Sequence, residues 1–206
     1  MNEMQRIRNT LGIMGMLLPI TLLFFNNVFG QDVNPSGVMT SISATWYSIA
    51  APFFICLVSG VGFFLFFYKG YDIRDRVLCF IAGIGALGLV FFPCILSGVE
   101  LRNFLNVPAG VSNILHFIFA FTFFAALIYI IGFQFTKTKG IYTRKKRNRN
   151  ILYIICAALM FFALLLGGLG SFFFDWTDGL FWGESIALWA FGIAWLTKGG
   201  VILKDL

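Results

Sequence analysis

Hydrophobic residues form six long runs along this chain, and short polar stretches separate them. The runs cover about residues 11–30, 48–68, 77–97, 113–135, 151–170 and 184–203. About 20 apolar residues can cross roughly 30 Å of hydrocarbon as an α-helix, because each residue adds about 1.5 Å. The pattern therefore predicts an all-α fold, a polytopic membrane bundle of six transmembrane helices formed as a single domain over residues 1–206.

The amino-acid composition supports the same fold class. Hydrophobic residues make up 59% of the chain, whereas charged residues make up only 12%. A soluble domain has about 25% charged residues and cannot bury so large an apolar fraction. The composition therefore indicates an integral membrane protein without a second, soluble domain.

Lysine and arginine are distributed unevenly among the segments that flank the apolar runs. Of the 15 such residues, 14 lie in the N-terminal segment, the second and fourth connections and the C-terminal end, and only Arg102 lies elsewhere. Basic segments stay in the cytoplasm, so we expect both termini to be cytoplasmic. The formal net charge of +6 therefore lies beside the membrane, where it favours anionic lipid headgroups as partners and excludes nucleic acid.

The N-terminal segment has a second interpretation. A basic head followed by an apolar stretch also resembles a secretory signal peptide, with a weak cleavage site at residues 28–30. The length of the run and Pro19 within it favour an uncleaved first helix.

Polar residues near the predicted outer ends of the helices form one candidate site. His116 is the only histidine and lies one turn inside the fourth run, and Glu184 begins the sixth run at a similar depth. An ionisable residue that faces a membrane bundle is a candidate for function. The pair is interpreted as a structural clasp, a pH-sensitive latch or an acid–base pair, or Glu184 simply marks the start of a helix at the water interface. The other members of this candidate outer polar cluster are Asn113, Glu100 and Arg102.

The fourth connection carries the densest positive charge of the chain. We expect it to contact anionic lipid headgroups on the cytoplasmic side, although a cytosolic partner protein remains an alternative. The residues expected to make this contact are Arg144, Lys145, Lys146, Arg147 and Arg149. The four cysteines fall inside apolar runs without metal-ligand spacing, so no metal and no other cofactor is predicted.

Several short motifs resemble the damage-regulated autophagy modulator superfamily and its bacterial relatives of unknown function. These motifs are SISATWYSIAAPFF before the second run, YKGYD after it, His116 in the fourth run and Glu184 in the sixth. The resemblance implies six helices, no established catalytic residues and a loose link to membrane lipid or stress processes. The short connections depart from the animal members, so a lysosomal or autophagy role is not carried over. The expected location is a bacterial inner membrane.

The predicted function is a non-enzymatic membrane module that binds lipid, a small hydrophobic ligand or a partner helix. A small transporter or channel is the first alternative, but it needs a polar path, and the third and fifth runs carry almost no polar side chains. A membrane-embedded lipid-modifying enzyme is the second alternative, and it needs more than His116 and Glu184. No catalytic residue is predicted, and the sequence leaves a homo-oligomer open.

Overall fold

The computed structural model describes residues 3–30, 38–70, 72–101, 104–138 and 143–203. These residues form helices, and no strand occurs among them. The α-helices are α1 (Glu3–Phe29), α2 (Ala51–Phe66), α3 (Ile73–Phe91), α4 (Ala109–Tyr129), α5 (Arg144–Phe173) and α6 (Gly179–Gly199). A 3-10 helix, η1 (Ser43–Tyr47), precedes α2, and one π-helical turn, η2 (Ile130–Gln134), continues α4.

Four of these helices are long and apolar enough to cross a membrane. They are α1, α5, α6 and the continuous helix made by α4 and η2. α2 is apolar but has only 16 residues, and α3 begins with the charged residues Arg74, Asp75 and Arg76. The all-helical fold and the membrane-compatible helices agree with the sequence prediction, and they support an integral membrane protein.

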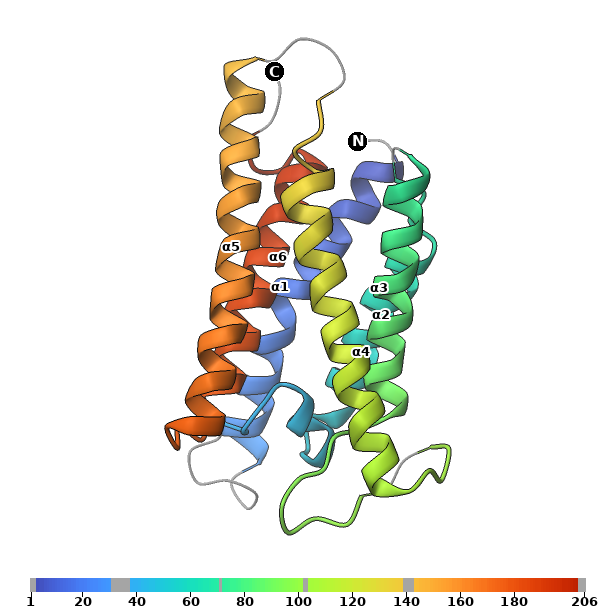
Figure 1. Ribbon diagram of the computed structural model, residues 1–206, viewed down its shortest axis with the longest axis vertical. Helices are drawn as coiled ribbons and strands as arrows, with labels where there is room; N and C mark the ends of the chain where they lie inside the picture. Colours follow the sequence, from blue (N-terminus) through green and yellow to red (C-terminus); the bar gives the residue numbers. More distant parts are fainter. Residues whose placement is uncertain (1–2, 31–37, 71, 102–103, 139–142, 204–206) are drawn as a thin grey trace.

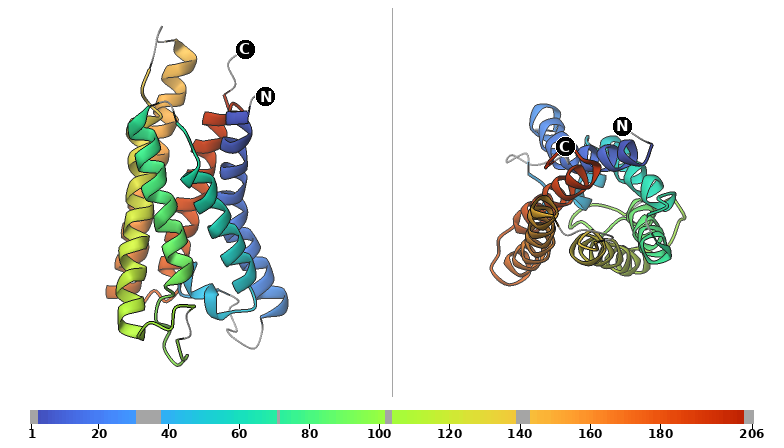
Figure 2. Two further views of the ribbon diagram at one scale, coloured as in Figure 1. Left: turned by 90° about the vertical axis from the view of Figure 1, so that its right-hand side faces the viewer. Right: turned by 90° about the horizontal axis from the view of Figure 1, so that it is seen from above.

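The helices form an open ring in the order α5, α6, α1, α2, α3 and α4, as the view along the bundle shows (Figure 2). α4 and α5 meet mainly through η2. α1 and α5 begin, and α6 ends, at the same end of the bundle (Figure 1). We call this end the basic end because it carries Arg8, Arg74, Lys146 and Lys198. The acidic end, opposite, carries Glu100, Asp175, Asp178 and Glu184.

α6 is more buried than the other helices that are long enough to cross a membrane. In its apolar segment 67% of the residues are buried, against 33% in the apolar segment of α5. Two glycines allow its neighbours to approach closely. A Cβ on Gly183 would lie 2.5 Å from the carbonyl oxygen of Ala163 in α5, and one on Gly192 would lie 2.7 Å from that of Gly12 in α1. Small residues at such contacts let membrane helices pack backbone to backbone.

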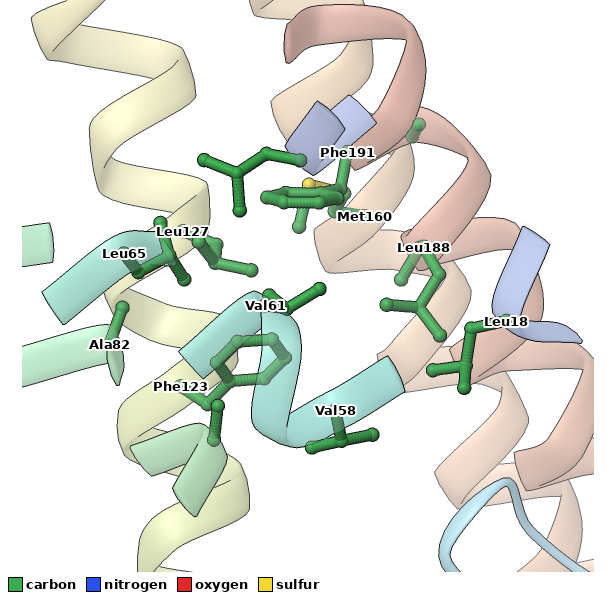
Figure 3. Close-up of a cluster of buried hydrophobic side chains, with 14 of the residues drawn as sticks. Leu18, Val58, Val61, Leu65, Ala82, Phe123, Leu127, Met160, Leu188 and Phe191 are labelled. Carbon is green, nitrogen blue, oxygen red and sulfur yellow. The ribbon is translucent and has the colours of Figure 1, made fainter. Parts of the chain in front are cut away.

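Large apolar side chains fill the interior and also cover the outside of the bundle. Inside, side chains from α1, α2, α4 and α6 point towards one another, among them Leu18, Val61, Phe123 and Leu188 (Figure 3). Outside, large apolar residues are exposed on every helix except α6, with Phe121 of α4 at 76%. A soluble monomer rarely exposes apolar surface on this scale. The exposed belt is the surface expected of helices that face lipid.

Several helix boundaries differ from those that hydrophobicity predicts, and two of them have a clear local cause. α3 ends at Phe91, six residues before the end of the apolar run, because Pro93 follows and its ring restricts the preceding residue to an extended conformation. α5 begins at Arg144, seven residues before its apolar run, and the Thr143 hydroxyl caps it by accepting a hydrogen bond from the Lys146 backbone N–H at 3.1 Å. The predicted basic connection is therefore largely the first turns of α5.

Candidate functional site

Glu184 lies in the second turn of α6, because the helix begins five residues earlier, at Gly179. Its side chain is buried, with 8% exposed, so Glu184 neither begins its helix nor faces solvent. The carboxylate accepts a hydrogen bond from the backbone N–H of Ile42 at 2.6 Å. A bond from a backbone donor to a buried carboxylate is among the stronger hydrogen bonds in proteins. Glu184 therefore fastens the segment before α2 to α6.

The segment held by Glu184 has its own local hydrogen bonds. The Ser41 hydroxyl accepts from the Ala44 backbone N–H at 2.9 Å, which closes a short turn at the start of η1. The Tyr47 hydroxyl donates to the backbone carbonyl of Cys94 at 2.6 Å. Burial raises the pKa of Tyr47 to about 12, with a smaller contribution from Cys94. Tyr47 therefore stays a neutral donor and joins η1 to the segment that follows α3.

His116 takes a different partner from the same end of the molecule. Its Nδ1 lies 2.8 Å from the backbone carbonyl of Phe92, so this nitrogen carries the proton and donates. One turn earlier in α4, the Ser112 hydroxyl donates to the carbonyl of Pro93 at 2.9 Å. The Asn113 side-chain oxygen accepts from the Ile95 N–H, also at 2.9 Å. Three side chains of α4 thus hold the irregular chain that follows α3.

The structure does not bring the candidate outer polar cluster together as one site. Glu184 bonds to Ile42 and His116 bonds to Phe92, and no hydrogen bond or ion pair joins these two side chains in the described structure. Glu100 lies in the exposed connection after α3, and Arg102 lies outside the described residues. α6 and α4 are not neighbours in the ring, which explains why the two side chains bond to different segments.

A small cavity of about 30 Å³ lies beside Glu184 inside the bundle. Its walls are almost entirely apolar, and Glu184 and Ser43 supply the polar groups. This volume suits a water molecule rather than a drug-sized ligand, which needs about 300 Å³ or more. The acidic end is therefore a set of hydrogen-bonded clamps with one small cavity.

The basic end is built differently, because positive side chains from three helices converge there. The Nζ atoms of Lys146 in α5 and Lys198 in α6 both donate to the backbone carbonyl of Phe135, at 3.0 Å and 3.3 Å. Arg8 of α1 donates from Nε to the Tyr68 hydroxyl at 2.9 Å, and from Nη1 to the carbonyl of Lys198 at 3.4 Å. We call Arg8, Lys146 and Lys198 the cation cluster.

Aromatic rings surround the cation cluster. The Lys198 ammonium lies 4.7 Å from the ring centre of Phe135 and 5.8 Å from that of Tyr153. Cations are attracted to the faces of such rings. The carboxylate of Asp75, whose side chain is 6% exposed, is close enough to attract the Lys198 ammonium group. Arg149 adds a further positive charge near Lys198. The site therefore combines a low-polarity wall with an excess of positive charge.

The five basic residues predicted to contact lipid divide into two groups. Lys146 and Arg149 are half-buried and face the bundle. The exposed ones are Arg144, Lys145 and Arg147. Arg8 was not predicted as a site residue. Its spacing in the sequence carries a signal for burial, because Arg8 falls on the same helical face as the buried residues Leu11, Gly15 and Leu22.

Comparison with known proteins adds no further assignment. No family model matches the chain, and no curated protein or solved structure is similar to it. The resemblance to the damage-regulated autophagy modulator superfamily therefore stays a sequence-based hypothesis.

Proposed function

We propose that this chain is a six-pass integral membrane protein whose basic end faces the cytoplasm and binds anionic lipid headgroups, without catalysing a reaction. The observation that supports this most directly is the convergence of Lys146 and Lys198 on one carbonyl oxygen. The two lysines come from different helices, so the fold itself positions them. Arg8 lies next to them through its bond to the Lys198 carbonyl.

An anion fits the chemistry of the cation cluster. Like charges held close together repel, and the aromatic wall screens them less than water does. A phosphate group supplies several acceptor oxygens and a compensating negative charge. Its binding would therefore stabilise the arrangement that Lys146 and Lys198 already adopt.

The location favours a lipid as the source of that phosphate. The cation cluster lies where α1 and α5 begin and α6 ends, at the edge of the apolar belt (Figure 1). Lipid headgroups occupy this depth in a bilayer. A basic residue near an anionic membrane surface contributes about 1 kcal/mol to binding. A lipid phosphate would reach the cluster from the side, with its acyl chains along the exposed apolar surface.

Lipid retention by the purified protein tests the proposed lipid binding. The Lys146→Gln, Lys198→Met double variant should bind phosphatidylglycerol about thirtyfold more weakly, since two charges of about 1 kcal/mol are removed. The measurement is native mass spectrometry of the detergent-solubilised protein titrated with phosphatidylglycerol or phosphatidylcholine. The matched control is Arg144→Gln with Arg147→Gln, two exposed charges at the start of the same helix. If both double variants lose the same affinity for phosphatidylglycerol, the binding is a general effect of surface charge and the proposed site is wrong.

Reporter insertion tests the proposed orientation separately. A reporter inserted after Lys145 or fused after Leu206 should give a cytoplasmic signal, and one inserted after Val99 should give an external signal. The expectation rests on the 14 basic residues that flank alternate apolar runs. A cytoplasmic signal from the position after Val99 would rule out the six-pass arrangement.

A further inference from the structure

A second cavity lies at the basic end of the bundle. It is an open groove of about 330 Å³ between the first turns of α3 and the end of α4. This volume is at the lower end of the range for small-molecule sites. Three of its lining residues are at least 45% exposed, so the groove opens on the outer surface of the bundle. The residues that line it are Ile73, Arg74, Val77, Leu78, Tyr129 and Gln134.

Arg74 supplies the positive charge of the groove. Its side chain is exposed, and its guanidinium group makes no hydrogen bond or ion pair with any residue that the structure describes. The nearest acid before it in the sequence, Asp72, is already bonded to Lys137 and to the Asp75 N–H, both at 2.9 Å. A guanidinium group can bind a phosphate through two parallel hydrogen bonds. The donors of Arg74 are therefore available to a phosphate in the groove.

Tyr129 supplies a second donor that the groove leaves accessible. Its side chain is 45% exposed, and its ring packs beside that of Phe133 with 4.9 Å between the ring centres. Its hydroxyl makes no hydrogen bond within the described part of the chain. Tyr129 belongs to a helical segment that is apolar enough to cross a membrane. Because little water is present at that depth, the phenol needs an acceptor that a lipid can provide.

The two donors lie at different depths in the groove. α3 runs inward from the basic end, so Arg74 lies nearer to water than Leu78 does, by about 6 Å for four helical residues. α4 runs outward to this end and continues as η2, so Tyr129 lies deeper than Gln134. Arg74 therefore lies at the level of lipid headgroups, and Tyr129 lies about one turn deeper.

The π turn closes the inner wall of the groove. The Phe135 N–H bonds to the carbonyl of Ile130 at 2.9 Å, five residues back instead of four. The wider turn shifts the register at the end of α4 and places Gln134 along the groove. Gln134 is 3% exposed and its amide oxygen is fully buried. It is therefore part of the wall, and the groups that a ligand can reach are the donors of Arg74 and Tyr129.

We propose that this groove binds a glycerophospholipid through its phosphate and one of its ester groups. Arg74 pairs with the phosphate. The Tyr129 hydroxyl donates to an ester carbonyl, which lies on the hydrocarbon side of the phosphate in such a lipid. The acyl chains continue along the apolar side chains of Val77 and Leu78. The lipid needs no net charge, so this inference rests only on the membrane location in the proposed function and not on anionic-lipid binding by the cation cluster.

Comparing two lipids that differ only in the ester carbonyls tests the proposal. Diacyl phosphatidylcholine and its dialkyl ether analogue have the same headgroup and, with equal chain lengths, differ only because the ether lacks the carbonyl oxygens. One hydrogen bond from Tyr129 should give the ester lipid an affinity about two- to tenfold higher. The measurement is native mass spectrometry of the full chain in detergent, titrated with short-chain forms of each lipid.

Two variants locate the lipid in the groove. Tyr129→Phe should abolish the preference for the ester lipid and leave thermal stability without lipid unchanged, because the hydroxyl makes no hydrogen bond in the described structure. Arg74→Gln should weaken binding of both lipids about tenfold, because the bond to the phosphate is charge-assisted. The matched control is Arg76→Gln, an exposed neighbour outside the groove, which should change the binding of neither lipid.

Three results would overturn the proposal. The first is equal binding of the ester and ether lipids by the unmodified protein, which would mean that Tyr129 donates to neither. The second is a preference for the ester lipid that persists in Tyr129→Phe. The third is an equal loss of affinity in Arg74→Gln and Arg76→Gln. None of these results affects anionic-lipid binding by the cation cluster, which is tested with phosphatidylglycerol and with the lysine variants.

Discussion

The two ends of the bundle use polar side chains in opposite ways. At the acidic end, Glu184, His116 and Tyr47 each bond to one backbone group of an irregular segment. At the basic end, Lys146 and Lys198 share a single carbonyl, and the Gln134 oxygen has no partner among the described residues.

The difference separates a structural role from a binding role. Buried polar groups whose bonds all fall within the protein hold its segments in place. Half-buried groups of like charge that converge favour a compensating anion beside them, because the anion offsets their mutual repulsion. On this comparison, substitutions at the acidic end should lower stability, and substitutions at the basic end should change binding instead.

The largest expected effect is at Glu184. Glu184→Leu should lower the free energy of unfolding by about 1–3 kcal/mol, because the Ile42 N–H then loses its buried acceptor. Glu184→Gln should cost less, since the amide oxygen can still accept. Chemical denaturation in detergent micelles measures both. Asp175→Asn is the control, because Asp175 is exposed and its φ of 52° suits asparagine. A cost at Asp175 equal to that at Glu184 would remove the distinction between a clamp and a surface charge.

A smaller effect is expected at His116. His116→Leu should cost about 1 kcal/mol of unfolding free energy, because the Phe92 carbonyl loses its donor. His116→Asn should recover part of this cost, since its amide can replace the Nδ1 donor. The double variant Glu184→Leu, His116→Leu should show additive costs within about 0.5 kcal/mol, because the two side chains have separate partners. A coupling well above this value would restore the predicted Glu184–His116 pair.

At the basic end, we expect a substitution to leave the free energy of unfolding unchanged or to raise it. Lys198→Met should leave the lipid-free protein equally stable or more stable, by less than about 1 kcal/mol, because the repulsion from Lys146 and Arg8 that it removes outweighs the attraction to Asp75. Thermal unfolding in detergent without lipid measures this. Lys145→Met, an exposed charge on α5, should have no effect within about 0.5 kcal/mol. A clear loss of stability in Lys198→Met would show that this lysine is a clamp like those at the acidic end.

The fold was largely predictable, because long apolar runs have few structures open to them in a membrane. The ends of the helices were less predictable. Lys and Arg have good helix propensity, so α5 continues outward to Arg144 where hydrophobicity alone ends it at residue 151. The start of α6 was predicted five residues too late because the charged residue Glu184 marks the boundary in the hydrophobic pattern, whereas the helix begins at Gly179 and includes the apolar residues that follow it.

The candidate sites were less predictable than the helices. The apolar pattern gives the depth of a residue in the membrane but not the order of the helices around the ring. Glu184 and His116 were therefore matched in depth, although α6 and α4 are not neighbours. Gln134 was missed because its position depends on one π turn, and a shift of a single residue leaves no mark in the hydrophobic pattern. The cation cluster was missed in part because Lys198 and Lys146 are 52 positions apart in the sequence.

The smallest expected effect is the pH dependence of stability that comes from the Asp72–Lys137 ion pair at the basic end. The hydrogen bond from the Asp75 N–H, followed by the bond from Lys137, lowers the pKa of Asp72 from its ordinary value of 3.8. A carboxyl group with a lowered folded-state pKa stabilises the protein above its unfolded-state pKa, and the stabilisation is lost as the pH falls through the folded value. Stability should therefore decline below about pH 4, to the extent that Asp72 contributes.

Asp72→Asn isolates that contribution, because asparagine also caps helices but does not titrate. The difference in unfolding free energy between the unmodified protein and Asp72→Asn should be constant near neutral pH and should shrink as the pH falls below 4. Denaturation measured at several pH values provides the comparison, with Asp178→Asn at the acidic end as the control. A difference that stays constant down to pH 2 would mean that Asp72 acts only as a neutral cap. The Asp72–Lys137 pair would then join α3 to the segment after η2 without any measurable charge effect.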